Sequence, residues 1–280
     1  MTEAANTYKV GGCTMIRSLF SGVSGIRNHQ IRMDALSNNI SNVNTTGFKA
    51  GRANFQDSLS QLLRGGGAGR NPMQAGTGIN TASIGNKMEQ GPLQVTGRTM
   101  DLAISGVGFF CVKQVDQDGA EVDPPLYTRD GAFFLDEENY IVNSSGCRLQ
   151  NDGTSIQLGS EDIVSISIDK TGVITYYPAG SDTPVNDQVI TINTFRNPEG
   201  LEKVGNSLYK EASSSGVASA ATAPGTGGVG TIESGYLEMS NADLSDEFTT
   251  MITTQRGYQA SSRVITVSDT LLEELIQLKR

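Results

Sequence analysis

The last forty residues, 241–280, read NADLSDEFTTMITTQRGYQASSRVITVSDTLLEELIQLKR. Apolar side chains recur there at alternating steps of four and three residues, namely Leu244, Phe248, Met251, Tyr258, Ile265, Leu272 and Ile276. This spacing is typical of a long helix that packs lengthwise against other helices. At 1.5 Å per residue such a helix spans about 55–60 Å, more than a small domain can cover. The stretch therefore predicts a helix that needs a long partner.

The other end of the chain carries a matching apolar stripe, formed by Ile16, Leu19, Val23, Ile26, Met33 and Ile40. We expect a helix near residues 15–43, and a terminal helical domain built from residues 15–60 and 240–280, whose two stripes form a self-assembly seam. The alternative is a pair of ordinary surface helices, because Gly22, Gly25 and Gly257 each cost a helix about 1 kcal/mol.

Local signals refine this expectation. Thr14 is predicted to cap the first helix, and Ser240 with Asp243 resembles a capping box before the last one. The single histidine, His29, is predicted to lie on an exposed helix face, because neither a nucleophile nor an orienting group is near it. Residues 1–14 lack an apolar run, and we expect them to be a disordered extension.

Composition excludes several classes of protein. The net charge of −9 over 280 residues argues against a nucleic-acid partner. Cys13, Cys111 and Cys147 show no CxxC spacing, so neither a zinc site nor a disulfide framework is expected. The carboxylates at residues 116–123 and 136–138 lack the spacing of a calcium loop. No apolar run approaches the ~18 residues of a membrane span. We therefore predict no metal, no cofactor, no catalytic residues and no membrane insertion.

The middle of the chain changes period from helical to alternating. From residue 93 to 212 the pattern predicts an antiparallel β domain, with a strand–turn–strand at 127–133 and a hairpin over 164–177 that turns at 169–172. The Gly-rich stretches 61–92 and 213–239 are predicted connectors, and Phe55 to Leu63 a helical turn or two. The fold class is α+β: a discontinuous terminal α-helical coiled-coil domain flanking a mainly antiparallel β domain.

The segment DALSNNISNVNTTGFK, residues 34–49, resembles the signature of the bacterial flagellar rod and hook proteins. The matching positions include Asn38, Asn39, Asn42, Asn44, Thr46, Gly47 and Phe48. Residues 240–260 resemble the C-terminal signature of the same family, and the ending 272–280 is similar to short hook proteins of Gram-positive-type bacteria. The resemblance extends from Met15 to Arg280.

The resemblance implies a subunit that polymerises into the hollow flagellar hook, the flexible joint between rod and filament. The expected partners are further copies of the chain, the rod, hook-cap and hook–filament junction proteins, and the type III export apparatus. Phe55 to Leu59 fits a short Phe-x-x-x-hydrophobic export pattern. The location would be the hook or basal body, outside the cell after export.

Two alternatives to the hook stay open. The long Gly-rich connectors favour a hook, because a joint must bend. A distal rod subunit of the basal body shares both signatures. A more remote alternative is a carbohydrate-active enzyme that uses paired carboxylates in the β domain.

Overall fold

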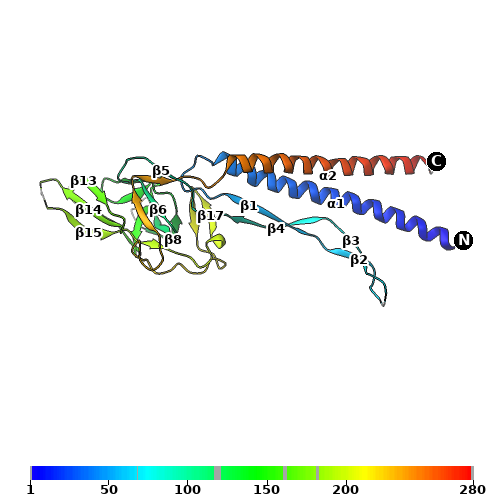
Figure 1. The fold of residues 1–280 in the computed structure, drawn as a ribbon, viewed down its shortest axis with the longest axis horizontal. Coiled ribbons are helices and arrows are strands. Elements are labelled where there is room, and N and C mark those ends of the chain that lie inside the picture. Colours follow the sequence, from blue (N-terminus) through cyan, green and yellow to red (C-terminus); the bar gives the residue numbers. More distant parts are fainter. Residues whose placement is uncertain (1, 68, 117–120, 160–162, 181–182, 279–280) are drawn as a thin grey trace. The chain divides into compact units, whose positions relative to one another are not determined.

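The computed structural model describes residues 2–67, 69–116, 121–159, 163–180 and 183–278, with side chains from Arg17 onward (Figure 1). The chain divides into two compact units. The helical unit contains residues 1–41, 51–85 and 243–280, and the β unit contains residues 42–50 and 86–242. The predicted α+β class is confirmed.

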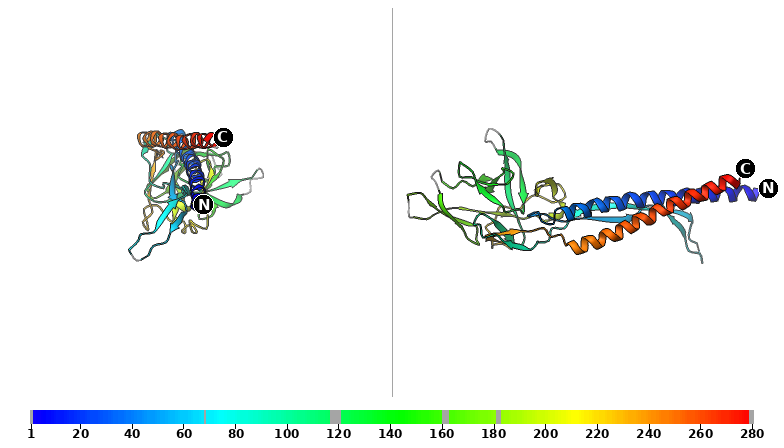
Figure 2. Two further views of the ribbon diagram at one scale, coloured as in Figure 1. Left: turned by 90° about the vertical axis from the view of Figure 1, so that its right-hand side faces the viewer. Right: turned by 90° about the horizontal axis from the view of Figure 1, so that it is seen from above.

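Two long helices dominate the helical unit. Helix α1 spans Thr2–Ser41 and helix α2 spans Leu244–Leu278. They lie alongside each other in antiparallel orientation, so that the start of α1 and the end of α2 are at the same end of the pair (Figures 1 and 2). The predictions of a disordered extension over residues 1–14 and of a cap at Thr14 are wrong. An established helix adds residues at little cost where no proline interrupts it, so α1 continues back to Thr2.

Helix α2 begins close to the predicted residue. The Asp243 carboxylate accepts a hydrogen bond from the backbone N–H of Ser245 at 2.8 Å, which satisfies one of the free donors in the first turn. Asp246 and Glu247 place further negative charge at this positive end of the helix dipole. The Ser240 hydroxyl accepts a bond from the N–H of Ala242 instead. The start is therefore a single Asp243 cap rather than a capping box.

The helical unit also holds four strands that the sequence did not predict. Strand β1 (Gly51–Asp57) pairs with β4 (Ile79–Asn86), and β2 (Ser60–Arg64) pairs with β3 (Met73–Gly76). Phe55 to Leu63 is thus extended, and residues 61–92 are not a simple connector. The glycines at 65–67 lie at the turn, where they break a helix but allow two extended segments to reverse direction.

The β unit is built mainly from one antiparallel sheet of nine strands, in the order β17-β18-β8-β7-β11-β10-β9, with β12 on β11 and β16 on β7. Its strands are β7 (Phe109–Val115), β8 (Glu121–Thr128), β9 (Phe133–Leu135), β10 (Ile141–Asn143), β11 (Arg148–Asn151), β12 (Thr154–Ser155), β16 (Ile192–Asn193), β17 (Glu202–Gly205) and β18 (Leu208–Lys210). The predicted strand–turn–strand over 127–133 is present as the end of β8 and the start of β9.

Smaller sheets complete the unit. Strands β13 (Ile163–Ile168), β14 (Val173–Pro178) and β15 (Val185–Val189) form one, and their first hairpin closes where predicted, with Gly172 N–H donating to Asp169 C=O at 2.8 Å. Two strands come from the predicted connector 213–239: β19 (Thr231–Ser234) pairs with β6 (Leu102–Ser105), and β20 (Tyr236–Glu238) pairs with β5 (Leu93–Val95). The β unit therefore extends beyond the predicted range 93–212.

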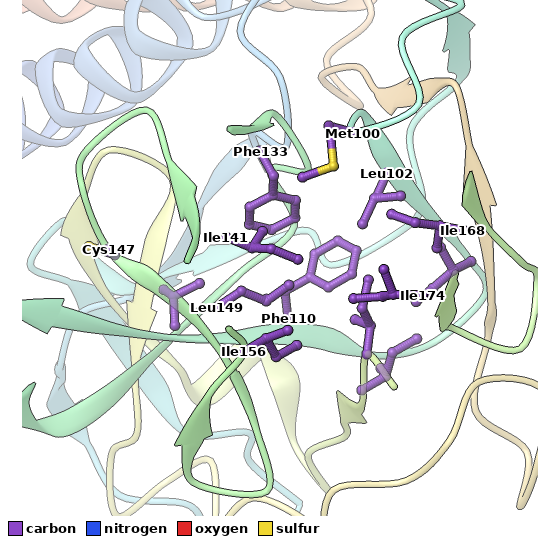
Figure 3. Packing of buried hydrophobic residues seen from close by; sticks show 14 of the residues in the cluster. Met100, Leu102, Phe110, Phe133, Ile141, Cys147, Leu149, Ile156, Ile168 and Ile174 are labelled. Carbon is purple, nitrogen blue, oxygen red and sulfur yellow. The ribbon is translucent and has the colours of Figure 1, made fainter. Parts of the chain in front are cut away.

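The sheets enclose one main hydrophobic core. Figure 3 shows Phe110 and Phe133 facing each other, edge to face at 5.3 Å between ring centroids, with Ile141, Leu149 and Ile156 around them. These side chains are fully buried. A 3₁₀ turn, Pro198–Gly200, and a second cluster around Phe109, Tyr127, Phe195 and Tyr209 close the other side of β7 and β8.

Candidate assembly surface

The two helices touch through residues with little or no side chain. A Cβ added at Gly25 would lie 2.7 Å from the Ser261 Oγ, and one at Gly257 would lie 2.7 Å from the His29 Cε1. A Cβ at Gly22 would meet the side chain of Ile265 at 3.0 Å. The glycines thus allow the two backbones to come closer than larger residues would permit.

We call this contact the small-residue seam. It runs through Ser18, Gly22, Gly25 and His29 on α1 and through Thr254, Gly257, Ser261, Ile265 and Ser268 on α2. The hydroxyls of Ser18 and Ser268 lie 3.1 Å apart near one end. On both helices the seam is offset from most of the predicted apolar stripe by one residue.

Apart from Ile265, which contacts Gly22, the predicted stripe therefore lies beside the contact rather than in it. Its half-buried members are Leu19, Ile26, Met33, Ile40, Met251, Ile265 and Leu272, whereas Val23, Leu244, Phe248, Tyr258 and Ile276 are exposed. Phe248 is 49% exposed and Ile276 68%. The side chains of Ile16 and Cys13 lie outside the described residues. The pairing of α1 with α2 leaves much of the stripe available, so its role in self-assembly stays a prediction.

Helix α2 presents further apolar residues to solvent on two flanks of the seam. With 3.6 residues per turn, Leu244, Phe248 and Ile252 lie on one side of the row formed by Thr254, Ser261 and Ser268. Other exposed residues lie on the opposite side, namely Val264, Val267, Leu271 and Leu278. Exposed apolar patches are typical of association sites, so assembly through these flanks stays a prediction.

His29 was predicted to lie on an exposed helix face, but it packs against β1 and α2. Its ring stands edge-on to Phe55 of β1, with 6.3 Å between ring centroids, and faces Gly257 of α2. Its Nδ1 is buried without a hydrogen-bond partner. Burial, and to a lesser extent the charge of Arg32, lower the pKa of His29. The prediction failed because β1 covers this face of α1, and no sequence signal placed a strand there.

Asn39, one of the signature residues, ties three elements of the helical unit together. Its side-chain oxygen accepts a bond from Gly51 N–H at 2.8 Å, and its Nδ2 donates to Gly51 C=O at 2.9 Å. The same Nδ2 donates to the Glu247 carboxylate at 3.0 Å. Burial raises the pKa of Glu247, and the bond from Asn39 opposes that rise. One buried amide thus joins α1, β1 and α2.

Later signature residues anchor residues 42–50 within the β unit. The Thr46 hydroxyl donates to the Asp130 carboxylate at 2.8 Å, and burial raises the pKa of Asp130. Gly47 has φ of +64°, and a Cβ there would lie 2.5 Å from the Asp130 nitrogen. The Lys203 ammonium lies 4.6 Å from the centre of the Phe48 ring. These contacts explain why this turn needs glycine flanked by a hydroxyl and an aromatic residue.

The asparagines of the signature play different parts. Asn42 accepts a bond from the Thr45 hydroxyl at 3.2 Å, inside the turn that follows α1. Asn38 and Asn44 are exposed. The signature is thus partly internal structure, and only its exposed members form the polar surface expected from the sequence.

A buried ionic cluster in the β unit was missed by the sequence analysis. The Glu238 carboxylate lies 2.5 Å from Lys49 Nζ and 3.1 Å from Arg129 Nη1, and it also accepts a bond from Gly91 N–H at 2.9 Å. Burial lowers the pKa of both Lys49 and Arg129, and Glu238 opposes this in each case. The three charged residues are distant in sequence, so no local pattern could have revealed them.

Other acidic residues and cysteines that could have formed a reactive or metal-binding site instead form ion pairs or lie buried. Glu121 and Asp123 pair with Lys113 at 3.4 and 3.2 Å. Within the described ranges, no three residues of the His, Cys, Asp and Glu types are grouped as a metal would require. Cys111 and Cys147 are free and buried, and burial raises the pKa of Cys111 to about 11. Over the described residues, no helix combines the length and the hydropathy that a membrane span requires.

Three family descriptions match the chain. They are "Flagella basal body rod protein" over residues 19–49, "Flagellar hook protein FlgE/F/G D1 domain" over 103–176, and "Flagellar basal body rod FlgEFG protein C-terminal" over 233–278. The first and last cover most of the paired helices described above, and the second falls within the β unit.

Whole-length relatives agree with these matches. The flagellar basal-body rod protein FlgG of Bacillus subtilis is 45% identical over 273 residues, covering 95% of this chain and 100% of that protein. The FlgG of Borreliella burgdorferi is 37% identical over 284 residues, with 95% and 100% covered. The flagellar hook protein FlgE of the same species is 28% identical over an alignment of 449 residues, again covering 95% and 100%. The chain belongs to the family of flagellar rod and hook proteins.

Proposed function

We propose that this chain is a distal rod subunit of the flagellar basal body, which polymerises with further copies of itself to form part of the drive shaft. The observation that carries the proposal is the end-to-end match to relatives named rod proteins over nearly this chain's own length. The hook relative is less similar and aligns only across a much longer span. We propose a purely structural role, without catalysis.

A second reason favours the distal rod over the hook, which the sequence had suggested. The preference for the hook rested on the resemblance of residues 272–280 to short hook proteins and on flexible Gly-rich connectors at residues 61–92 and 213–239. Both stretches instead contribute paired strands, β2, β3 and β4 in the first and β19 and β20 in the second. Hydrogen-bonded strands restrict bending, which suits a shaft better than a joint.

The exposed apolar flanks of α2 are the proposed self-assembly surface. Phe248, Ile252 and Leu271 are each about half exposed, so burying them against other copies would release apolar area from water. A head-to-tail contact between two different patches generates a helical filament when its rotation does not close a ring. Neighbouring rod and hook proteins and the type III export apparatus are the further proposed partners.

Electron microscopy of basal bodies from a strain that lacks this gene tests the proposal. We expect truncated rods without hooks, and complete rods after the wild-type gene is restored. Complete rods that lack only the hook would instead identify the chain as a hook subunit. Normal flagella would show that the chain has no essential place in either structure.

A further inference from the structure

The ribbon formed by β2 and β3 is unusually exposed. All five residues of β2 are exposed, and so are three of the four in β3. Leu62 is 56% exposed and Met73 51%, and Leu63 is also exposed. An isolated two-stranded ribbon is marginally stable in water, and exposed apolar side chains add to its cost. The ribbon therefore has the properties of a segment that is completed by a partner.

The charge of the ribbon restricts what that partner can be. Residues 58–86 contain Arg64 and Arg70 and no other charged residue. Among the residues that the structure describes, neither arginine forms an ion pair with a carboxylate. A surface that combines apolar side chains with two free guanidinium groups fits an apolar patch edged by acids.

The β unit carries such a patch. Its sequence holds ten Lys and Arg against twenty-one Asp and Glu, a net charge of −11. The helical segments 1–41 and 243–280 hold eight of each and are neutral. At the β9–β10 turn, exposed Phe134 and Leu135 are followed directly by exposed Asp136, Glu137 and Glu138. Among the residues whose exposure the structure describes, only this patch, defined as residues 134–138, joins two exposed large apolar residues to three consecutive acids.

We infer that the β2–β3 ribbon of one copy docks on the 134–138 patch of a second copy. Leu62, Leu63 and Met73 would cover Phe134 and Leu135, while Arg64 and Arg70 pair with the carboxylates. Glu138 already meets Arg148 at 3.1 Å, but its side chain is 67% exposed and can accept a second cation. The inference rests on the proposed polymerisation, and it specifies one contact within that polymer.

Site-specific photocross-linking tests the contact in cells. A benzophenone amino acid replaces Leu62 in the full-length chain, basal bodies are isolated after irradiation, and adducts are mapped by mass spectrometry. We expect a copy-to-copy adduct to the peptide that contains residues 134–138. Adducts confined to the same copy, to α2 of another copy or to a different protein overturn the inference. Basal bodies without this chain overturn the proposed function as well, which separates the two failures.

A charge exchange gives the second test. The double variant Arg64→Glu with Arg70→Glu should lower the adduct yield about tenfold, because exposed pairs become like-charge contacts. Adding Glu137→Arg with Glu138→Arg should restore most of it. The matched control, Arg196→Glu with Lys210→Glu, makes the same net change of charge at exposed sites in the β unit and should leave the yield unchanged. A control that lowers the yield equally, or an exchange that restores nothing, refutes the electrostatic pairing.

Discussion

The buried cluster of Lys49, Arg129 and Glu238 supports a quantitative prediction. The Glu238 carboxylate pairs with two cations, Lys49 Nζ at 2.5 Å and Arg129 Nη1 at 3.1 Å. All three side chains are almost completely buried. Glu238→Gln keeps the size of the side chain and an oxygen for the N–H of Gly91, but it removes the negative charge. Two buried cations then lack a counter-charge, and breaking a buried pair in this way costs about 3–5 kcal/mol.

Lys49→Met is the matched comparison. It removes one cation and leaves Glu238 paired with Arg129, so we expect a smaller loss of about 1–3 kcal/mol in the free energy of unfolding. In the variant that carries both substitutions, Arg129 is the one charged member left. The two losses should therefore not be additive, as for residues that share a network.

Guanidinium denaturation, followed by tyrosine near-ultraviolet circular dichroism, measures these changes in the β unit. The signal suits this unit because the chain lacks tryptophan and Tyr127 and Tyr209 are buried beside the cluster of aromatic rings. A loss below about 1 kcal/mol for Glu238→Gln would refute the reasoning, since that is the scale of an exposed pair. A larger loss for Lys49→Met than for Glu238→Gln would refute it as well.

Three further predictions use other parts of the structure. Gly47→Ala should lower the free energy of unfolding of the β unit by about 1–3 kcal/mol, because φ is +64° and the new Cβ would meet the Asp130 nitrogen; an unchanged denaturation midpoint would contradict this. Phe248→Asp should change stability by less than about 0.5 kcal/mol yet prevent incorporation into basal bodies, and rods of normal length would refute the assembly surface. Cys111, with a pKa of about 11, should react with iodoacetamide at pH 8 about a hundredfold more slowly than in the unfolded chain, as measured by mass spectrometry; equal rates would refute its burial.

The paired helices show what hydrophobic periodicity in the sequence can predict and what it cannot. The apolar repeat correctly predicted two long helices at the ends of the chain, because helix period follows from the local backbone geometry. It did not predict which faces meet. Gly22, Gly25 and Gly257 counted against the helices as costs, whereas in the structure they create the contact.

The strands in residues 51–86 were missed for a related reason. Phe55, Leu59, Leu62 and Leu63 fit both a helical turn and an alternating strand, and short apolar runs do not distinguish the two. Pairing with β4 and β3 decided in favour of strands. Such pairing depends on segments ~20 residues apart, and local propensity does not report it.

The sequence by itself determined the helical ends, the antiparallel character of the middle, the turn at residues 169–172 and the membership of the flagellar family. Each of these depends on residues that are close together in the chain. The tertiary structure alone decided the small-residue seam, the environment of His29, the cluster around Glu238 and the exposure of the β2–β3 ribbon. These features join residues that are distant in sequence, and their free energy comes from close packing and from burial of charge, which exist only once the chain has folded.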